Sequence, residues 1–166
     1  FENEENEVFL HGTDGAGANN LIVRNGCRFP IDSMPELKTY GTDNRYTDNH
    51  LYMNGPEVFN FTIKQIPSFF EQILKANSLD IASIDYVVFH QANKFMLESL
   101  RKSCKIPKEK FLISMSETGN TVSNTIPIVL KELLRNIQDK NSTGHLKVLV
   151  LGFGVGLSWS GGILKV

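Results

Sequence analysis

His90 is the residue of this sequence best placed for chemistry, because it directly follows a run of apolar residues with strong strand preference. That run, Tyr86–Phe89, predicts a buried strand, and the residues from Lys94 onward have helical spacing. Ligands in open α/β sheets collect outside the carboxyl ends of strands, so a histidine here is well placed to meet a substrate. The position alone fits equally a histidine whose two ring nitrogens are satisfied by backbone groups.

Three motifs follow one another along the second half of the chain. They are His90-Gln91-Ala92-Asn93, then Gly119-Asn120-Thr121 running to Ile126-Pro127, and then the glycine-rich stretch Gly152–Trp159. In this order, with Asn120 about 30 positions after His90, they resemble the β-ketoacyl-acyl-carrier-protein synthase III family of the thiolase superfamily. The resemblance is close over roughly residues 50 to 166 and loose over the first fifty.

The resemblance implies decarboxylative condensation. A cysteine takes up an acyl group as a thioester, a malonyl thioester loses CO2, and the resulting enolate attacks the acyl group. Decarboxylation moves negative charge onto the donor's thioester oxygen, and that charge must be met by pre-positioned hydrogen-bond donors. A neutral histidine N–H and an asparagine N–H supply two such donors without a formal charge. We therefore expect His90 and Asn120 to act jointly as the catalytic pair.

The resemblance also implies a set of residues that bind the substrate or its carrier. These are Gln91, Ala92, Asn93, Lys94, Phe95, Gly55, Phe59, Gly119, Phe153 and Gly154. The substrates are expected to be thioesters of coenzyme A or of an acyl-carrier protein's phosphopantetheine, with no cofactor and no metal. Where the family commonly has basic residues to meet the acidic carrier, this sequence has Asn60 and Phe95, and Lys94 is the nearest positive charge.

The nucleophile is expected outside these residues. In the family that cysteine begins a helix of the N-terminal half, where the helix dipole lowers its pKa. Neither Cys27, in Asn25-Gly26-Cys27-Arg28, nor Cys104, late in a predicted helix, has that context. Because the chain also starts at Phe1 and not at Met, we expect it to be the C-terminal half of an enzyme that is a homodimer when complete. The alternative is a non-catalytic partner subunit that keeps the fold and binds an active synthase or a carrier protein.

Composition and residue spacing disfavour nucleic-acid binding, a membrane span, a disulfide framework and a zinc site. The chain has 166 residues, 41% of them hydrophobic, and a net charge of -1, so it has no basic footprint for nucleic acid. No apolar stretch approaches the ~20 residues of a membrane span, and no signal peptide is visible. The two cysteines suggest no disulfide framework. The four histidines lack the close spacing of a zinc site. A cytoplasmic protein is the simplest expectation.

The N-terminal third is predicted to be mostly strand and loop. Residues 8–11 and 21–24 read as short strands that could pair as a hairpin, and residues 25–54 as loop. We interpret residues 1–50 as the tail of the family's N-terminal half and a linker, and residues 51–166 as its C-terminal domain.

The remainder alternates helix and strand. A helix from Gly55 has one apolar face and contains Pro67, which is expected to kink or divide it. The expected elements that follow are strand 85–90, helix 94–104, strand 111–115, loop 116–121, a helix begun by Ser123, Asn124 or Thr125, and strands 147–151 and 157–166. This order predicts a layered α/β fold. With the resemblance, it is thiolase-like, the C-terminal half of a duplicated fold.

Overall fold

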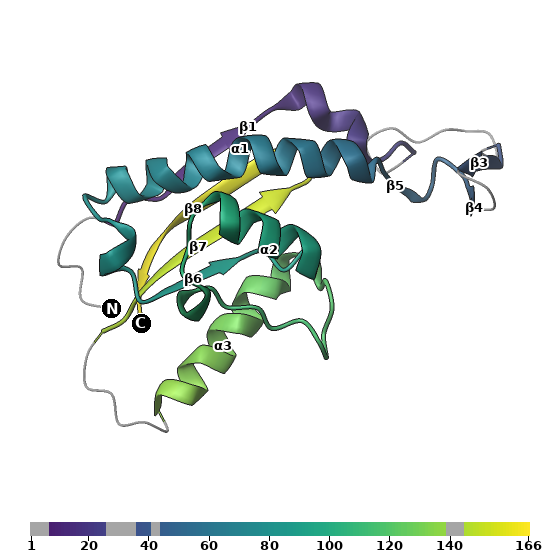
Figure 1. Cartoon of the computed structure of the whole chain (residues 1–166). Coiled ribbons are helices and arrows are strands. Elements are labelled where there is room, and N and C mark those ends of the chain that lie inside the picture. The colour runs from purple at the N-terminus through teal and green to yellow at the C-terminus, as the bar shows by residue number, and fades with distance from the viewer. Residues whose placement is uncertain (1–6, 26–35, 41–43, 139–144) are drawn as a thin grey trace.

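The centre of the molecule is a four-stranded mixed sheet (Figure 1). The structure is a computed structural model and describes residues 7–25, 36–40, 44–138 and 145–166. The strand order is β1-β8-β7-β6. The strands are β1 (Leu10–Thr13), β6 (Tyr86–Phe89), β7 (Lys147–Gly154) and β8 (Ser158–Lys165). Strands β6 and β7 are parallel, with Phe89 opposite Leu151, whereas β8 is antiparallel to both β7 and β1.

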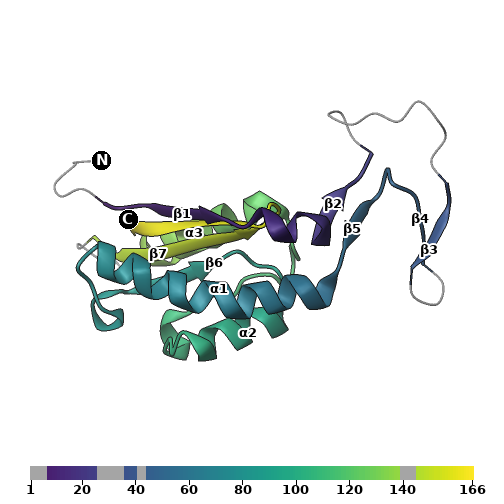
Figure 2. The same ribbon diagram turned by 90° about the horizontal axis from the view of Figure 1, so that it is seen from above.

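Helices cover both faces of this sheet (Figures 1 and 2). Helices α1 (Gly55–Ala76) and α2 (Lys94–Ser103) pack on one face, and α3 (Thr125–Gln138) packs on the other. The side chains of β6 alternate accordingly: Val87 and Phe89 join the α1 and α2 cluster, and Val88 joins the α3 cluster. The expected layered α/β fold is therefore confirmed.

The parallel pairing of β6 with β7 decides where the functional side chains lie. Parallel neighbours need a crossover connection, and α2 and α3 lie on the connection between these two strands. The carboxyl ends of both strands consequently meet at one edge of the sheet. His90 follows β6 at that edge, and Phe153 and Gly154 end β7 beside it.

The predicted hairpin between the first two strands is wrong. Strand β1 pairs with β8, with His11 opposite Ser160, and β2 (Leu21–Val23) pairs with β5 (Leu51–Met53). The 3-10 helix Gly15–Asn20 separates them. Strand β1 also begins later than predicted, because the backbone N–H and C=O of Val8 bond the side chain of Asn77 at 2.9 and 3.0 Å.

Residues 25–54 contain more strand than expected. Besides β5, the short strands β3 (Lys38–Tyr40) and β4 (Asn44–Tyr46) pair with each other, and both ribbons extend away from the main sheet (Figure 2). These residues were predicted to be loop because they are rich in glycine, proline and asparagine. Composition does not show which distant residues pair as strands. The proposed domain boundary near residue 50 stays a prediction.

Two further expectations are corrected by packing. Pro67 does not divide helix α1, because burial of the flanking Ile66, Phe69 and Phe70 holds the helix against the sheet and offsets a cost of about 3 kcal/mol, whereas the expected kink stays a prediction. The predicted strand 111–115 is reduced to a single bridge between Phe111 and Val87. Its backbone leaves the sheet because the N–H of Ser114 donates to Gln91 Oε1 at 3.0 Å.

Candidate active site

The His90 ring is held at the carboxyl end of β6 by one buried hydroxyl and one aromatic ring. The backbone N–H of His90 donates to Leu151 O at 2.9 Å, which extends the β6–β7 ladder by one step. Its Nδ1 lies 2.8 Å from Oγ1 of Thr125, which is only 2% exposed. Phe153 meets the imidazole edge-on, with centroids 5.5 Å apart. These contacts fix the ring and engage Nδ1.

Burial lowers the pKa of His90 below its usual value, and a hydrogen bond with the backbone of Val122 opposes that shift in part. The lowered pKa means that His90 stays neutral at neutral pH and into mildly acidic solution. Protonation in the folded state becomes favourable only below the ordinary pKa, so the folded state loses stability as pH falls through that range. A neutral ring is what the expected role as an uncharged hydrogen-bond donor requires.

Asn120 is exposed and, with Gly119 before it, follows the turn at residues 116–118. Gly119 has φ +60°, a backbone angle that glycine adopts without strain. Asn120 Oδ1 accepts the backbone N–H of Val122 at 2.9 Å. This bond leaves the two Nδ2 hydrogens of Asn120 without a hydrogen-bond partner among the described residues, and so available to a ligand.

Val122 connects the two expected catalytic residues. Its N–H holds Asn120, and its carbonyl accepts the backbone N–H of Thr125 and lies 3.0 Å from Thr125 Oγ1, which also reaches His90. Val122 has φ +57°, a conformation that is costly for a β-branched residue, by about 1–3 kcal/mol. The structure therefore brings the His90 ring and the Asn120 turn onto one short segment, Val122–Thr125.

Gln91 has a structural role in place of the expected substrate contact. Its side chain is fully buried, its Nε2 donates to Phe89 O at 2.7 Å and Leu112 O at 3.4 Å, and its Oε1 accepts from Ser114. Each polar atom of the amide is used inside the protein. Gln91 thus holds the end of β6 against residues 112–114 and presents nothing to a ligand.

The residues after Gln91 begin helix α2 and form part of the outer surface. Asn93 caps the helix, with Oδ1 accepting from Met96 N at 2.8 Å, and Ala92 packs on the α1 and α2 cluster. Lys94 is exposed and makes no ion pair within the described ranges. Phe95 is 73% exposed and stacks on Phe59 of α1, with ring centroids 5.6 Å apart. In this pair the Phe59 ring is half-buried against the core and the Phe95 ring faces outward.

The expected glycines lie at element ends with space around them. Gly55 begins α1 after its cap Asn54, and Gly154 ends β7 before the turn to β8, so the glycine-rich stretch joins two strands. A Cβ at Gly55, Gly119 or Gly154 would contact no atom within 4 Å. Whether substrate approaches these glycines stays a prediction.

Thr125 was not expected in the site. The sequence presents it only as one of three possible caps for the helix that follows, because nothing local marks a hydroxyl 35 positions after His90 as its partner. Only the packing of α3 against β6 places it there.

The two cysteines do not change the expectation that the nucleophile lies elsewhere. Cys104 caps the carboxyl end of α2, and burial, together with the charge of Glu71, raises its pKa to about 12. A thiol with such a pKa is not a thiolate at neutral pH. Cys27 lies outside the described residues.

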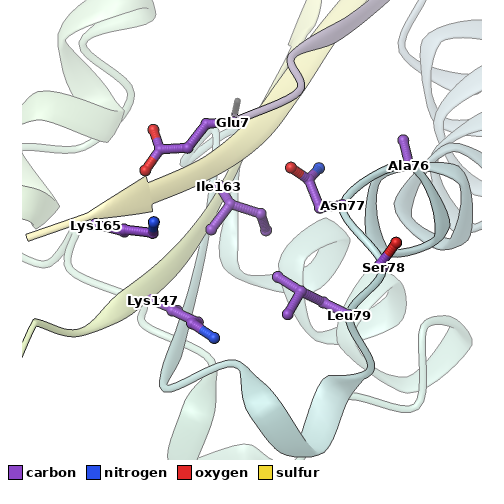
Figure 3. A pocket seen from close by; sticks show the side chains of 8 residues that line it. All are labelled: Glu7, Ala76, Asn77, Ser78, Leu79, Lys147, Ile163 and Lys165. Atoms are coloured by element: carbon purple, nitrogen blue, oxygen red, sulfur yellow. The ribbon is translucent and has the colours of Figure 1, made fainter. Parts of the chain in front are cut away.

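A cavity of 340 Å³ lies at the opposite end of β7 from His90 (Figure 3). It is lined by Glu7, Ala76, Asn77, Ser78, Leu79, Lys147, Ile163 and Lys165. Asn77 already uses its amide to hold Val8, and none of the expected site residues lines this cavity.

Among the described helices, none has both the length and the apolarity of a membrane span.

Comparison with known proteins identifies the family. The family 3-Oxoacyl-[acyl-carrier-protein (ACP)] synthase III C terminal matches residues 74–166, which is more than half of the chain. The chain belongs to the 3-oxoacyl-acyl-carrier-protein synthase III family. A β-ketoacyl-acyl-carrier-protein synthase III of Lactococcus lactis subsp. lactis is 31% identical over 154 residues, which cover 93% of this chain and 44% of that protein. The sequence-based prediction of this family is confirmed.

Solved structures of synthase III proteins share the fold. A crystal structure of a 3-oxoacyl-(acyl-carrier-protein) synthase III at 2.1 Å has TM-score 0.87 and 39% identity, over 98% of this chain and 50% of the other. The corresponding synthase of Burkholderia xenovorans LB400 has TM-score 0.80 and 34% identity, over 95% and 43%. These matches confirm the thiolase-like layered fold. The chain spans half or less of the synthase III proteins that it matches.

Proposed function

We propose that this chain is the C-terminal domain of a synthase III that condenses a malonyl thioester with an acyl thioester and releases CO2. The observation that carries the proposal is the Val122–Thr125 segment, which holds both the neutral His90 and the Asn120 turn at the carboxyl edge of the sheet. The chain covers only 44% of the Lactococcus lactis relative. The activity of the whole protein is therefore part of the proposal.

In the proposed reaction, His90 and Asn120 meet the charge that decarboxylation creates. The bond between the malonyl carboxylate and the α-carbon breaks, CO2 leaves, and the electron pair forms an enolate whose charge lies largely on the thioester oxygen. His90 N–H and Asn120 Nδ2–H donate to that oxygen. The α-carbon then attacks the enzyme-bound acyl thioester, which expels the cysteine thiolate. Neither His90 nor Asn120 needs to lose a proton.

The acyl-carrying cysteine is proposed to come from an N-terminal domain. The high pKa of Cys104 and its place at the end of α2 support this assignment. Coenzyme A or carrier-protein thioesters are the proposed substrates, with no further cofactor. A homodimer of the complete protein remains a prediction from the resemblance, and a cytoplasmic location remains a prediction from the composition.

The test of the proposal is product formation by the complete protein. With an acyl-coenzyme A and malonyl thioester, mass spectrometry is expected to show a 3-oxoacyl thioester, with CO2 released in equal amount. Tight binding to an active synthase or carrier protein with no product and no CO2 would contradict the proposal and favour the non-catalytic partner subunit.

The carrier preference is expected to be unusual, because two exposed side chains at the positions expected to be basic carry no positive charge, which leaves Lys94 as the nearest basic residue. Asn60 and Phe95 stand where the resemblance predicts positive charge, and Phe95 presents an aromatic face. Basic groups at an interface rim mainly accelerate association with an acidic partner. We expect malonyl-coenzyme A to serve comparably to malonyl-carrier protein, and Phe95→Arg to raise kcat/KM for the carrier form by about tenfold at low salt.

This prediction is tested over a salt series with both donors, and Phe95→Leu serves as the uncharged control. A strong preference of the unmodified protein for an acidic carrier, falling steeply with salt and unchanged in Lys94→Ala, would contradict it. That outcome would place the docking charges outside the residues described here.

A further inference from the structure

The backbone of Val122 has a left-handed conformation that few valines adopt. Among the described residues, positive φ angles outside glycine occur only at Ser78, Lys105 and Val122, and Val122 is the only one of the three with a branched β-carbon. The branch crowds the backbone in this region, whereas glycine adopts it without strain. A glycine would therefore be the expected residue here if only the turn mattered.

Burial of the side chain does not offset this strain. Val122 is 71% exposed and belongs to neither of the two apolar clusters that the described residues form. Its backbone, by contrast, is fully used. The N–H donates to Asn120 Oδ1, the carbonyl accepts from Thr125, and the His90 ring also bonds this backbone. These bonds explain the turn but not the isopropyl group, since glycine could form each of them.

The bond between Val122 N–H and Asn120 Oδ1 places the isopropyl group next to the Asn120 amide. Only this hydrogen bond of 2.9 Å and the covalent bonds N–Cα and Cα–Cβ separate Oδ1 from the branched carbon. In the proposed reaction the Nδ2 hydrogens of the same amide meet the thioester oxygen of the donor. The α-carbon of the donor lies two bonds from that oxygen, so the reacting end of the donor and the isopropyl group are both neighbours of one amide.

We propose that Val122 is a specificity-determining residue whose isopropyl group excludes donors that carry an alkyl group on the α-carbon. The proposal rests on the proposed function, because it concerns the donor that His90 and Asn120 bind. A malonyl thioester has only hydrogens on its α-carbon and fits. A methylmalonyl thioester adds one methyl group there. A β-branched side chain is stiff about χ1, so Val122 does not rotate away to make room for that methyl group.

Comparison of malonyl- and methylmalonyl-coenzyme A as donors for the complete protein tests the proposal. Both donors lose CO2 by breaking the same bond, and mass spectrometry separates the 3-oxoacyl product from the 2-methyl-3-oxoacyl product. Racemic methylmalonyl-coenzyme A supplies both configurations of the α-carbon. One methyl group changes kcat/KM by about ten- to two-hundredfold in a fitted pocket. Val122→Gly is therefore expected to raise the methylmalonyl-to-malonyl ratio of kcat/KM by at least about tenfold.

Two further variants separate the effect of the side chain from that of the backbone. Val122→Thr keeps the shape of the side chain and is expected to keep the donor ratio of the unmodified protein. Ser78→Gly is the matched backbone control, because Ser78 has φ 54° and lines the cavity at the far end of β7. It is expected to leave the ratio unchanged. Neither glycine variant is expected to lower the urea midpoint, because relief of the positive φ outweighs the added freedom of the unfolded chain.

The outcomes separate the two proposals. If the unmodified protein releases CO2 from malonyl-coenzyme A but the donor ratio is the same in Val122→Gly, the specificity role is overturned and the proposed function stands. A lowered urea midpoint with an unchanged ratio overturns it too, and means that another part of the complete protein covers Val122. An unmodified protein that uses both donors equally also overturns it. Release of CO2 from neither donor contradicts the proposed function, and the specificity role falls with it.

Discussion

His90→Ala is expected to reduce malonyl-thioester decarboxylation by the complete synthase about a hundred- to a thousandfold. Loss of one donor to a developing oxyanion costs on the order of 2.7–4 kcal/mol of transition-state stabilisation. Acylation of the cysteine that we place in the N-terminal domain is expected to continue, because that step does not use the enolate site. CO2 release and acyl-enzyme formation, measured separately on the same preparation, check both halves of this prediction.

Two further variants sharpen the result. Asn120→Ala is expected to lose a comparable factor, since its free Nδ2 hydrogens supply the second donor. His11→Ala removes an exposed imidazole on β1 and is the matched control, with an expected rate close to that of the unmodified protein. An undiminished decarboxylation rate in either His90→Ala or Asn120→Ala would remove that residue from the proposed pair.

Phe89→Ala is expected to destabilise the fold by about 3–5 kcal/mol, because it opens a cavity at the end of β6. The Phe89 side chain is fully buried and meets the edges of Phe70 and Phe111, with centroids 6.1 and 5.2 Å apart. Urea unfolding of the 166-residue chain, followed by the fluorescence of its single tryptophan, Trp159, measures the change.

The control for Phe89 is the same truncation at the surface. Phe95→Ala removes a 73% exposed ring whose stacking on Phe59 is worth at most about 1.5 kcal/mol. Phe89→Leu retains most of the buried volume and is expected to fall between the two. Equal losses for Phe89→Ala and Phe95→Ala would mean that Phe89 does not anchor the strand that carries His90.

Much of the local structure follows from sequence periodicity. The apolar run before His90 and the single apolar face of α1 each depend on neighbours within one turn or one strand. Those elements form close to their predicted bounds. The motif order was likewise sufficient to point to the family and to the expected pair His90 and Asn120.

Pairings between distant residues could not be predicted in the same way. Strand β1 needed Ser160 and its neighbours in β8, which lie about 150 positions away, so a hairpin with the nearer β2 looked equally reasonable. Gln91 shows the same limit, because its burial depends on residues 112–114, which run beside β6. A polar residue beside a catalytic histidine gives no sequence signal of whether it faces the substrate or the core.

The sequence by itself determined the family, the layered class of fold and the residue types of the site. Only the tertiary structure decided how His90 is held, because that depends on α3 crossing behind β6 and bringing Thr125 Oγ1 within 2.8 Å of Nδ1. A hydrogen bond is directional and changes over fractions of an ångström, whereas hydrophobic periodicity reports only which face of an element is buried. The orientation of the imidazole is therefore fixed by packing between elements that are far apart in the chain.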